Sequence, residues 1–406
     1  MTRTRLSHAS IAIAAVSVLL VRSAGAAEWP QWRGGVKNGV SSDRSLPIRW
    51  NAEDGIRWKV DLPGRGLSSP IIHGDRLYLT ACTGPTQDRL HVLCFDTETG
   101  KQRWERQFWA TGLTACHPKT CMAAPTPATD GKRVYALFAT NDVVCLDQEG
   151  TLLWYRSLAN DYPNITNQVG MAASPVLWND TLILTLETDS ESCALGIDKF
   201  TGMNKWRVER ELGINWVTAV IADRGTGAEL IVQSRTDVTA YDPGTGQMRW
   251  VHRAGGLDVI PSPVSDGGAI YVPAGNLIAL RPRQGNETPE LIWESKKVRA
   301  STASPILYQD RLYAVNSVGV LSCADPANGE LLWQERVKGP FSASPIAGDD
   351  KLYVVNEEGT TTVIDTRSED RIISTNPLGE TILGSPAVSG GRIFMRSDKH
   401  LFCIGL

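Results

Sequence analysis

A sequence unit recurs eight times in this 406-residue chain, at steps of 40 to 57 residues, and constrains its fold more than any other feature. Each unit opens with a Ser-Pro pair or a close variant and continues with short alternating stretches rich in Val, Leu and Tyr. This alternation favours strands, and a repeat of ~40–45 residues is typical of four-stranded propeller blades. We therefore predict an all-β, eight-bladed β-propeller built from four-stranded antiparallel blades. The units are marked by Pro70, Pro127, Pro175, Ala219, Pro263, Pro305, Pro345 and Pro386.

A second pattern, Asp-x-x-x-Gly-x-x-x-Trp, stands near the end of most units. Asp96, Gly100 and Trp104 form the first example. An aspartate that caps a turn, followed by a glycine that accepts positive φ, suits a tight hairpin between the third and fourth strands. The pattern lapses in the fifth unit, which has Arg281 for the Asp, and in the seventh, which has Ile373 near the place of the Trp.

This pattern resembles the tryptophan-docking motif of the PQQ-like (quinoprotein alcohol dehydrogenase-like) β-propeller repeat family, which includes BamB-like outer-membrane assembly propellers. The resemblance covers nearly all of the chain after residue 27. It implies that each tryptophan packs between neighbouring blades, which suits a flat side chain that buries ~150–250 Å². The tryptophans expected to dock blades are Trp58, Trp104, Trp154, Trp206, Trp250, Trp293 and Trp333.

The eighth unit ends directly after its third strand. Residues 55–60 (GIRWKV) read as a solitary fourth strand ahead of the first complete unit. Pairing this N-terminal strand with the C-terminal strands would close the ring and leave no unpaired blade edge. We therefore expect a lead-in segment at 28–54 and a single propeller domain at 55–406.

Residues 1–27 have the order of a cleavable signal peptide. Arg3 and Arg5 precede an apolar run at 11–21 and a small-residue stretch at 23–27. No lipobox cysteine follows, so we expect an exported periplasmic or extracellular protein without a membrane span. The formal charge of −3 gives no basic character that would favour nucleic acid. We expect a monomer.

The cysteines divide into two groups. Cys94, Cys145, Cys323 and Cys403 occupy a third-strand position that small residues fill in other units, so we expect them to be buried packing residues. The spacing Cys116-x4-Cys121 in an exported chain favours a local disulfide, while separate thiols and a metal or cofactor role stay open.

Extra length gathers in two blade-to-blade connections, at 107–124 and 157–171. Such connections leave four-stranded blades on the same face as the loops between second and third strands. Because function in a propeller resides in its loops, we expect this face to bind a partner or ligand. The candidate contacts are Trp109, Cys116, His117, Lys119, Cys121, Tyr162, Asn164, Asn167 and Trp216.

Two functions follow from the resemblance. The first is a non-catalytic exported scaffold that binds an envelope protein or complex, with no cofactor and no catalytic residues. The alternative is a quinoprotein dehydrogenase, in which PQQ and Ca²⁺ at the ring axis oxidise an alcohol or sugar. The chain has no recognisable motif for Ca²⁺ ligands and no nucleophile or nucleotide-binding motif, so we expect the scaffold.

Overall fold

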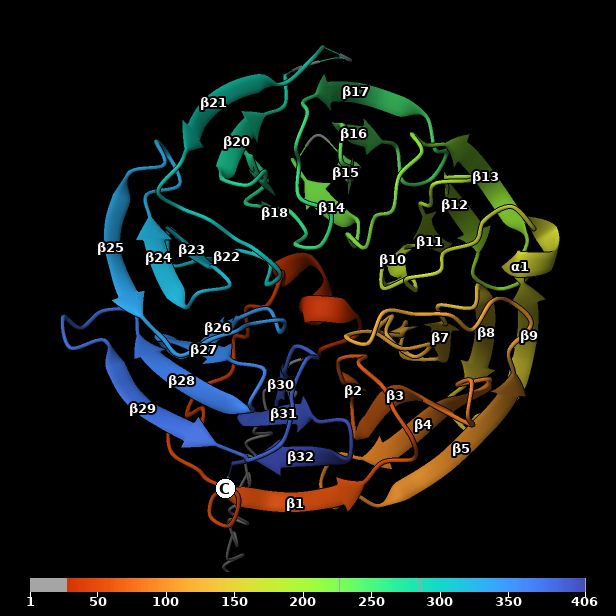
Figure 1. Cartoon of the computed structure of the whole chain (residues 1–406), viewed down its shortest axis with the longest axis horizontal. Coiled ribbons are helices and arrows are strands. Elements are labelled where there is room, and N and C mark those ends of the chain that lie inside the picture. The colour runs from red at the N-terminus through yellow and green to blue at the C-terminus, as the bar shows by residue number, and fades with distance from the viewer. Residues whose placement is uncertain (1–27, 226, 284, 286, 406) are drawn as a thin grey trace, which may run out of the picture.

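The computed structural model describes residues 28–225, 227–283, 285 and 287–405, so the predicted signal peptide at 1–27 lies outside the described residues. Eight four-stranded antiparallel sheets stand around a central axis like the blades of a propeller (Figure 1). The first strand of each blade lies next to the axis and the fourth lies at the rim. The predicted eight-bladed propeller is confirmed.

The blades follow one another in chain order. Blade 1 is β2 (Ile71–His73), β3 (Arg76–Thr83), β4 (Arg89–Asp96) and β5 (Gln102–Trp109); blade 2 is β6 (Ala128–Thr129), β7 (Arg133–Leu137), β8 (Asp142–Asp147) and β9 (Leu152–Ser157); blade 3 is β10 (Val176–Trp178), β11 (Thr181–Leu186), β12 (Cys193–Asp198) and β13 (Asn204–Glu209); blade 4 is β14 (Val220–Asp223), β15 (Ala228–Gln233), β16 (Asp237–Tyr241) and β17 (Met248–Arg253).

The second half of the ring repeats this order. Blade 5 is β18 (Val264–Ser265), β19 (Ile270–Pro273), β20 (Leu277–Arg281) and β21 (Glu290–Ser295); blade 6 is β22 (Ile306–Tyr308), β23 (Arg311–Val315), β24 (Val320–Ala324) and β25 (Leu331–Arg336); blade 7 is β26 (Ile346–Gly348), β27 (Lys351–Val355), β28 (Thr360–Asp365) and β29 (Ile372–Pro377); blade 8 is β30 (Ala387–Ser389), β31 (Arg392–Arg396), β32 (His400–Ile404) and β1 (Ile56–Asp61).

Blade 8 joins the two ends of the propeller. Strand β1 pairs antiparallel with β32, so that Trp58 faces Cys403 and Lys59 faces Phe402. Blade 8 therefore takes its outer strand from the N-terminal part of the chain, as predicted. This closure removes the unpaired edge that the C-terminal strands would otherwise expose.

Burial in each blade follows from position in the ring. Strand β4 in the middle of blade 1 is buried over six consecutive residues, whereas the rim strand β25 alternates between half-buried and exposed side chains. A central strand packs on both faces against neighbouring blades, so both faces are apolar. The four third-strand cysteines, Cys94, Cys145, Cys323 and Cys403, are fully buried, as expected.

Most tryptophans of the motif pack on the hairpin of the next blade. The indole of Trp104 lies over Gly150, where an added Cβ would come within 2.8 Å of the ring, and its Nε1 donates to the carbonyl oxygen of Gln148 at 2.7 Å. Only glycine leaves room for this approach at positive φ. The same arrangement joins Trp58 to Gly100, Trp154 to Gly202, Trp206 to Gly246 and Trp293 to Gly329.

The other two motif tryptophans, Trp250 and Trp333, do not lie over a described hairpin glycine of the next blade. The indole Nε1 of Trp250 donates to Glu229 of its own blade at 3.2 Å. The ring of Trp333 is covered by the guanidinium of Arg371, which lies 4.5 Å from the ring centroid. Each of these two tryptophans has a polar partner, but that partner is a side chain and not a backbone carbonyl oxygen of the next hairpin.

Blade 7 obtains its tryptophan from the lead-in segment. In other blades a second-strand tyrosine contacts the tryptophan of the same blade, as Tyr313 contacts Trp333 at 5.8 Å. In blade 7 the equivalent Tyr353 stacks on Trp50 at 6.4 Å, and the backbone N–H of Trp50 donates to Asn376. The segment ahead of β1 thus fills the gap left by Ile373.

Within the described residues, helical structure is limited to short segments, α1 (Leu158–Asp161) and the 3-10 segment η1 (Trp32–Lys37). Among the residues that the structure describes, no helix combines the length and apolar character needed to span a membrane.

Candidate binding site on the ring axis

Eight hydroxyl side chains, one from each blade, surround the ring axis. The backbone N–H of Ser262 donates to the Oγ of Ser304 at 2.9 Å, and the N–H of Ser304 donates to the Oγ of Ser344 at 3.0 Å. Seven such bonds link consecutive blades, each 2.9 to 3.0 Å long. We call these residues the hydroxyl belt: Ser69, Thr126, Ser174, Thr218, Ser262, Ser304, Ser344 and Ser385.

A second ring of side chains lies two positions before the belt in each blade. This upper tier is mostly apolar, with Trp216 and Ile260 as its largest members. The belt and the upper tier together enclose an axial chamber of about 120 Å³. The upper tier consists of Leu67, Ala124, Ala172, Trp216, Ile260, Thr302, Ser342 and Leu383.

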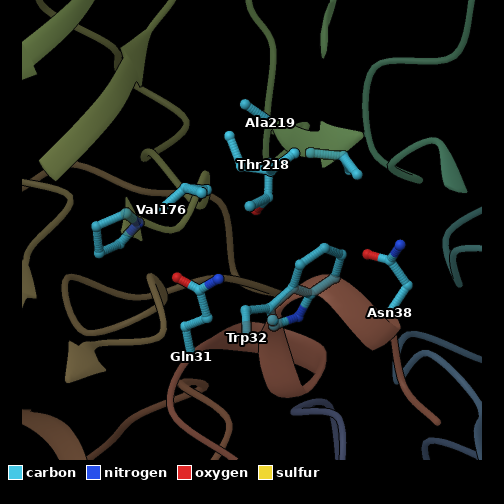
Figure 2. Close-up of a pocket in the computed structure, with 10 residues that line it drawn as sticks. Gln31, Trp32, Asn38, Val176, Thr218 and Ala219 are labelled. Carbon is cyan, nitrogen blue, oxygen red and sulfur yellow. The ribbon is translucent and has the colours of Figure 1, made fainter. Parts of the chain in front are cut away.

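The lead-in segment closes the chamber from one side. Segment η1 lies at the centre of the ring, and the indole of Trp32 points toward Thr218 of the belt (Figure 2). Trp29 pairs with Ile72 through backbone hydrogen bonds, and the side chain of Gln31 accepts the N–H of Leu177. Ile72 and Leu177 each lie three residues after a belt position, in the first strand of their blade. The hairpins between first and second strands stand on this side of the ring, which we call the lower face.

The chamber opens on the upper face, where the blade-to-blade connections emerge. A wider cavity of about 380 Å³, the mouth, extends outward from the upper tier and adds His117, Lys119, Thr120 and Val169 to its lining. The mouth therefore lies on the face that the sequence predicted to be functional.

The insertion at 107–124 lines the mouth and reaches blade 7. Lys119 Nζ forms an ion pair at 2.9 Å with Glu357, which belongs to the second-to-third-strand loop of blade 7. The same carboxylate accepts the hydroxyl of Ser342 at 2.8 Å, and Arg65 donates to the carbonyl oxygen of Pro118 at 2.6 Å. These contacts attach the insertion to blades 1 and 7.

The structure brings three of the predicted contact residues together. His117, Lys119 and Trp216 all line the mouth. The indole Nε1 of Trp216 donates to the carbonyl oxygen of Gly170 at 2.7 Å. This bond joins the 157–171 insertion to the wall of the mouth.

The other predicted contacts lie away from the axis. Trp109 ends the rim strand β5 and is 59% exposed, with the Arg89 guanidinium 3.4 Å from its ring centroid. The hydroxyl of Tyr162 accepts a hydrogen bond from Asn204 at 2.6 Å. Asn164 contributes its backbone oxygen to Ser190, and Asn167 is buried against its own loop. None of these four lines the mouth as the described residues define it.

The predicted pair Cys116 and Cys121 is present as two free thiols, so the disulfide stays a prediction. Gln87 connects Cys116 to a third thiol, Cys82: its Nε2 donates to Cys116 Sγ at 3.8 Å, and its Oε1 accepts the thiol of Cys82 at 3.3 Å. A hydrogen bond with Cys121 lowers the pKa of Cys82, while burial raises that of Cys121 well above its usual value. Cys82 and Cys121 therefore lie within hydrogen-bonding reach of each other.

The sequence reasoning missed the hydroxyl belt and Trp32. Each belt residue lies directly before the Pro or Ala that marks its unit, so the signal was present in the Ser-Pro pairs. The spacing of those pairs gives the number of units but not the direction of the Ser and Thr side chains. Their common direction toward the axis becomes visible when the blades are placed in a ring.

The residues around the axis do not fit a calcium–quinone centre. Calcium takes 6–8 oxygen ligands, mainly from carboxylates and amides, and oxidation of an alcohol needs a base. The described lining of the chamber and mouth contains neither a carboxylate nor a side-chain amide. Across the described part of the chain, no group of three or more His, Cys, Asp and Glu side chains could hold a metal ion.

Comparison with solved structures shows the same fold in proteins of both expected classes. BamB from Moraxella catarrhalis is 16% identical, with a TM-score of 0.64 over 86% of this chain and 97% of that chain. A europium-containing methanol dehydrogenase is 11% identical, with a TM-score of 0.70 over 94% and 98%. The quinohemoprotein alcohol dehydrogenase of Comamonas testosteroni is 12% identical, with a TM-score of 0.68 over 93% and 80%. At such identities the likeness shows the fold alone.

Comparison with curated protein sequences finds no match. A family model described as "Outer membrane protein assembly factor BamB" matches residues 35–195, 170–317, 286–372 and 317–404. These overlapping matches run over almost all of the described propeller. The chain therefore belongs to the PQQ-like β-propeller repeat family that this BamB model describes.

Proposed function

We propose that this protein is an exported, non-catalytic scaffold that binds an envelope protein through its upper face. The observation that carries the proposal is the mouth, a cavity of about 380 Å³ that lies on the face bearing both long insertions. Concave, mostly apolar sites with a few polar groups are the usual binding sites of proteins.

The composition of the mouth favours recognition over chemistry. Leu67, Ile260 and Leu383 supply apolar surface, and His117 and Lys119 supply the ionisable groups. Lys119 is already paired with Glu357. The family description, which names outer-membrane protein assembly, supports an envelope partner for this chain as well.

A site-specific cross-linking experiment tests the proposal. A photoreactive amino acid at Ile260, which is 43% exposed in the mouth, should capture a discrete partner in the cell envelope. The matched control carries the same group at Met203, which is 68% exposed beside the blade 3 hairpin on the lower face. Capture should fall at least fivefold when His117→Ala is added to the Ile260 probe. Equal capture from both faces would contradict the proposal.

A second measurement addresses the dehydrogenase alternative. The protein after residue 27 is reconstituted with PQQ and Ca²⁺, and we expect neither retained quinone absorbance nor dye-linked oxidation of an alcohol and sugar panel. The expectation rests on the lining of the axis, which offers hydroxyls and aliphatic groups where such a centre requires carboxylates. Retained quinone with turnover would overturn the scaffold assignment.

A further inference from the structure

The hydroxyl belt presents unused hydrogen-bond donors to the axial chamber. A hydroxyl has one O–H donor and two lone pairs. In seven belt residues one lone pair accepts a backbone N–H from the neighbouring blade. Within the described chain no protein group accepts the O–H of these seven side chains, all of which are at least nine-tenths buried. Seven donors therefore converge on one small space.

Two buried arginines lie beside the belt without an acidic partner. Arg33 of η1 donates through Nη2 to the carbonyl oxygen of Pro305, next to Ser304 of the belt, at 2.6 Å. Its Nε and Nη1 are buried and have no hydrogen-bond partner among the described atoms. Burial lowers the pKa of Arg33 to about 9, so the guanidinium stays charged at neutral pH.

The second arginine lies on the other side of the axis, where blades 8 and 1 meet. Arg396 ends β31, and its Nη1 donates to the carbonyl oxygen of Thr80 at 2.8 Å and to the Oγ of Ser68, which precedes belt residue Ser69. Its Nη2 is buried and unpartnered within the described chain. Burial lowers the pKa of Arg396 to about 10, which again leaves it charged.

No negative charge in the described lining offsets these two cations. The chamber and mouth contain no carboxylate, and the ionisable groups of the mouth are His117 and Lys119. A buried charge is costly unless it is paired and hydrogen-bonded. Water in the chamber would satisfy the hydroxyls, but it would leave Arg33 without a compensating charge among the described residues and Arg396 with only the carboxylate of Asp398, which lies beyond ion-pair distance.

We propose that the axial chamber binds a small oxyanion of the size of phosphate. Its oxygens accept the belt O–H groups, and its charge offsets Arg33 and Arg396 through the low-dielectric interior. The chamber volume of about 120 Å³ is several times the ~10–15 Å³ that one water needs on the same measure. The anion enters through the mouth, because Trp32 closes the lower side.

This site lies deeper along the axis than the partner-binding surface proposed above and shares only the upper tier with it. The oxyanion occupies the deep chamber, whereas a protein partner contacts the mouth and the loops around it. Either inference can therefore fail while the other holds.

Thermal unfolding in sodium phosphate tests the site. At constant ionic strength balanced with sodium chloride, the midpoint should rise saturably with phosphate, because a ligand that binds the folded state alone stabilises it. Thr302→Asp places a carboxylate in the chamber wall at a residue without a described side-chain hydrogen bond, and should weaken phosphate binding at least tenfold. Thr288→Asp makes the same charge change at an exposed position and should bind like the parent.

The outcomes separate the chamber from surface binding. No saturable shift in the parent protein, or an equal shift in both variants, would overturn the proposal. If Thr302→Asp does not fold, crystals of the parent protein soaked in sodium selenate decide the matter. An anomalous peak inside the hydroxyl belt is expected, whereas peaks at the surface alone would show an adventitious ion only and refute the site.

Discussion

Four consecutive joints, from blade 8 through blades 1, 2 and 3 to blade 4, use the same contact, in which a rim tryptophan lies over the hairpin glycine of the next blade. We call this half the regular arc. In the irregular arc, from blade 4 back to blade 8, three of the four joints depart from that contact; only Trp293 and Gly329 between blades 5 and 6 keep it. The departures occur where the receiving hairpin differs. The tryptophan and the glycine of the following blade therefore form one structural unit.

The lead-in segment makes several of its contacts with the irregular arc. Val40 bridges to Ala347 of blade 7, Asp43 accepts the N–H of Gly391 in blade 8, and Trp50 stacks on Tyr353. A continuous N-terminal segment thus supplies contacts where the repeated motif does not. Substitutions in the two arcs test whether the contacts of the lead-in segment stabilise the ring as much as the tryptophan–glycine contacts do.

The largest effect is expected in the regular arc. Trp104→Ala removes a buried indole from the joint between blades 1 and 2, together with its hydrogen bond to Gln148. Large-to-small changes of buried aromatic residues cost about 3–5 kcal/mol. Urea unfolding followed by fluorescence measures the loss. Trp109→Ala, at an exposed position of the same strand, is the control and should cost about 1 kcal/mol or less, because it removes only the contact with Arg89; equal losses would show that the joint does not depend on the docked indole.

Trp50→Ala should come next, with a loss of about 3 kcal/mol, because Trp50 is buried and stacked on Tyr353. Trp50→Phe keeps a ring at this place and should recover at least half of the loss. The same urea experiment measures both variants. If Trp50→Ala unfolds like the parent protein, the lead-in segment is only a tether and the irregular arc is stable without it.

The contrast between these two tryptophans shows what the sequence could predict. The number of blades and the closing strand follow from local patterns, because the Ser-Pro spacing and the residues around Trp58 repeat in most units. The role of Trp50 could not be predicted, since its partner Tyr353 is about 300 residues away and no repeat pattern includes the lead-in segment. The sequence therefore shows only a missing tryptophan near Ile373, whereas in the structure Trp50 packs against blade 7 in its place.

The candidate site was predictable to a similar degree. Insertion length pointed to the face on which the mouth lies, because extra residues between blades can emerge only there. It placed His117 and Lys119 at the mouth but also selected Trp109 and Tyr162, which lie farther out on the same inserted segments. Loop length locates a face, whereas the path of a loop across that face depends on contacts such as Lys119 with Glu357.

A pH-dependent contribution is expected at the ring-closing blade. Burial acts to raise the pKa of Glu380, but hydrogen bonds from Ser397, His400 and Lys59 outweigh it and lower the pKa to about 2. An unfolded glutamate titrates near ~4.3, so this carboxylate stabilises the fold above that pH. The stabilisation is lost as the pH falls toward 2. After allowance for solvent screening at this partly exposed carboxylate, we expect a contribution on the order of 1–2 kcal/mol at neutral pH.

Glu380→Gln isolates this contribution from that of other carboxylates. The variant should be less stable than the parent at pH 6, and the difference should vanish as the pH approaches 2. Chemical unfolding at a series of pH values measures the difference. Glu209→Gln, at a carboxylate whose side chain is 87% exposed, is the control and should follow the parent curve. A difference that is constant with pH would contradict the titration of Glu380.

The smallest effect concerns Trp333, whose joint replaces a hairpin glycine with the guanidinium of Arg371. A cation over an indole at a partly exposed site contributes about 0.5–1 kcal/mol. Arg371→Ala should therefore cost no more than this, and a double-mutant cycle with Trp333→Leu should show a coupling of the same size. Arg371→Lys should retain part of it, because the charge stays above the ring. A coupling near zero would mean that packing alone holds blades 6 and 7 together, and that the irregular arc needs no substitute for the glycine contact.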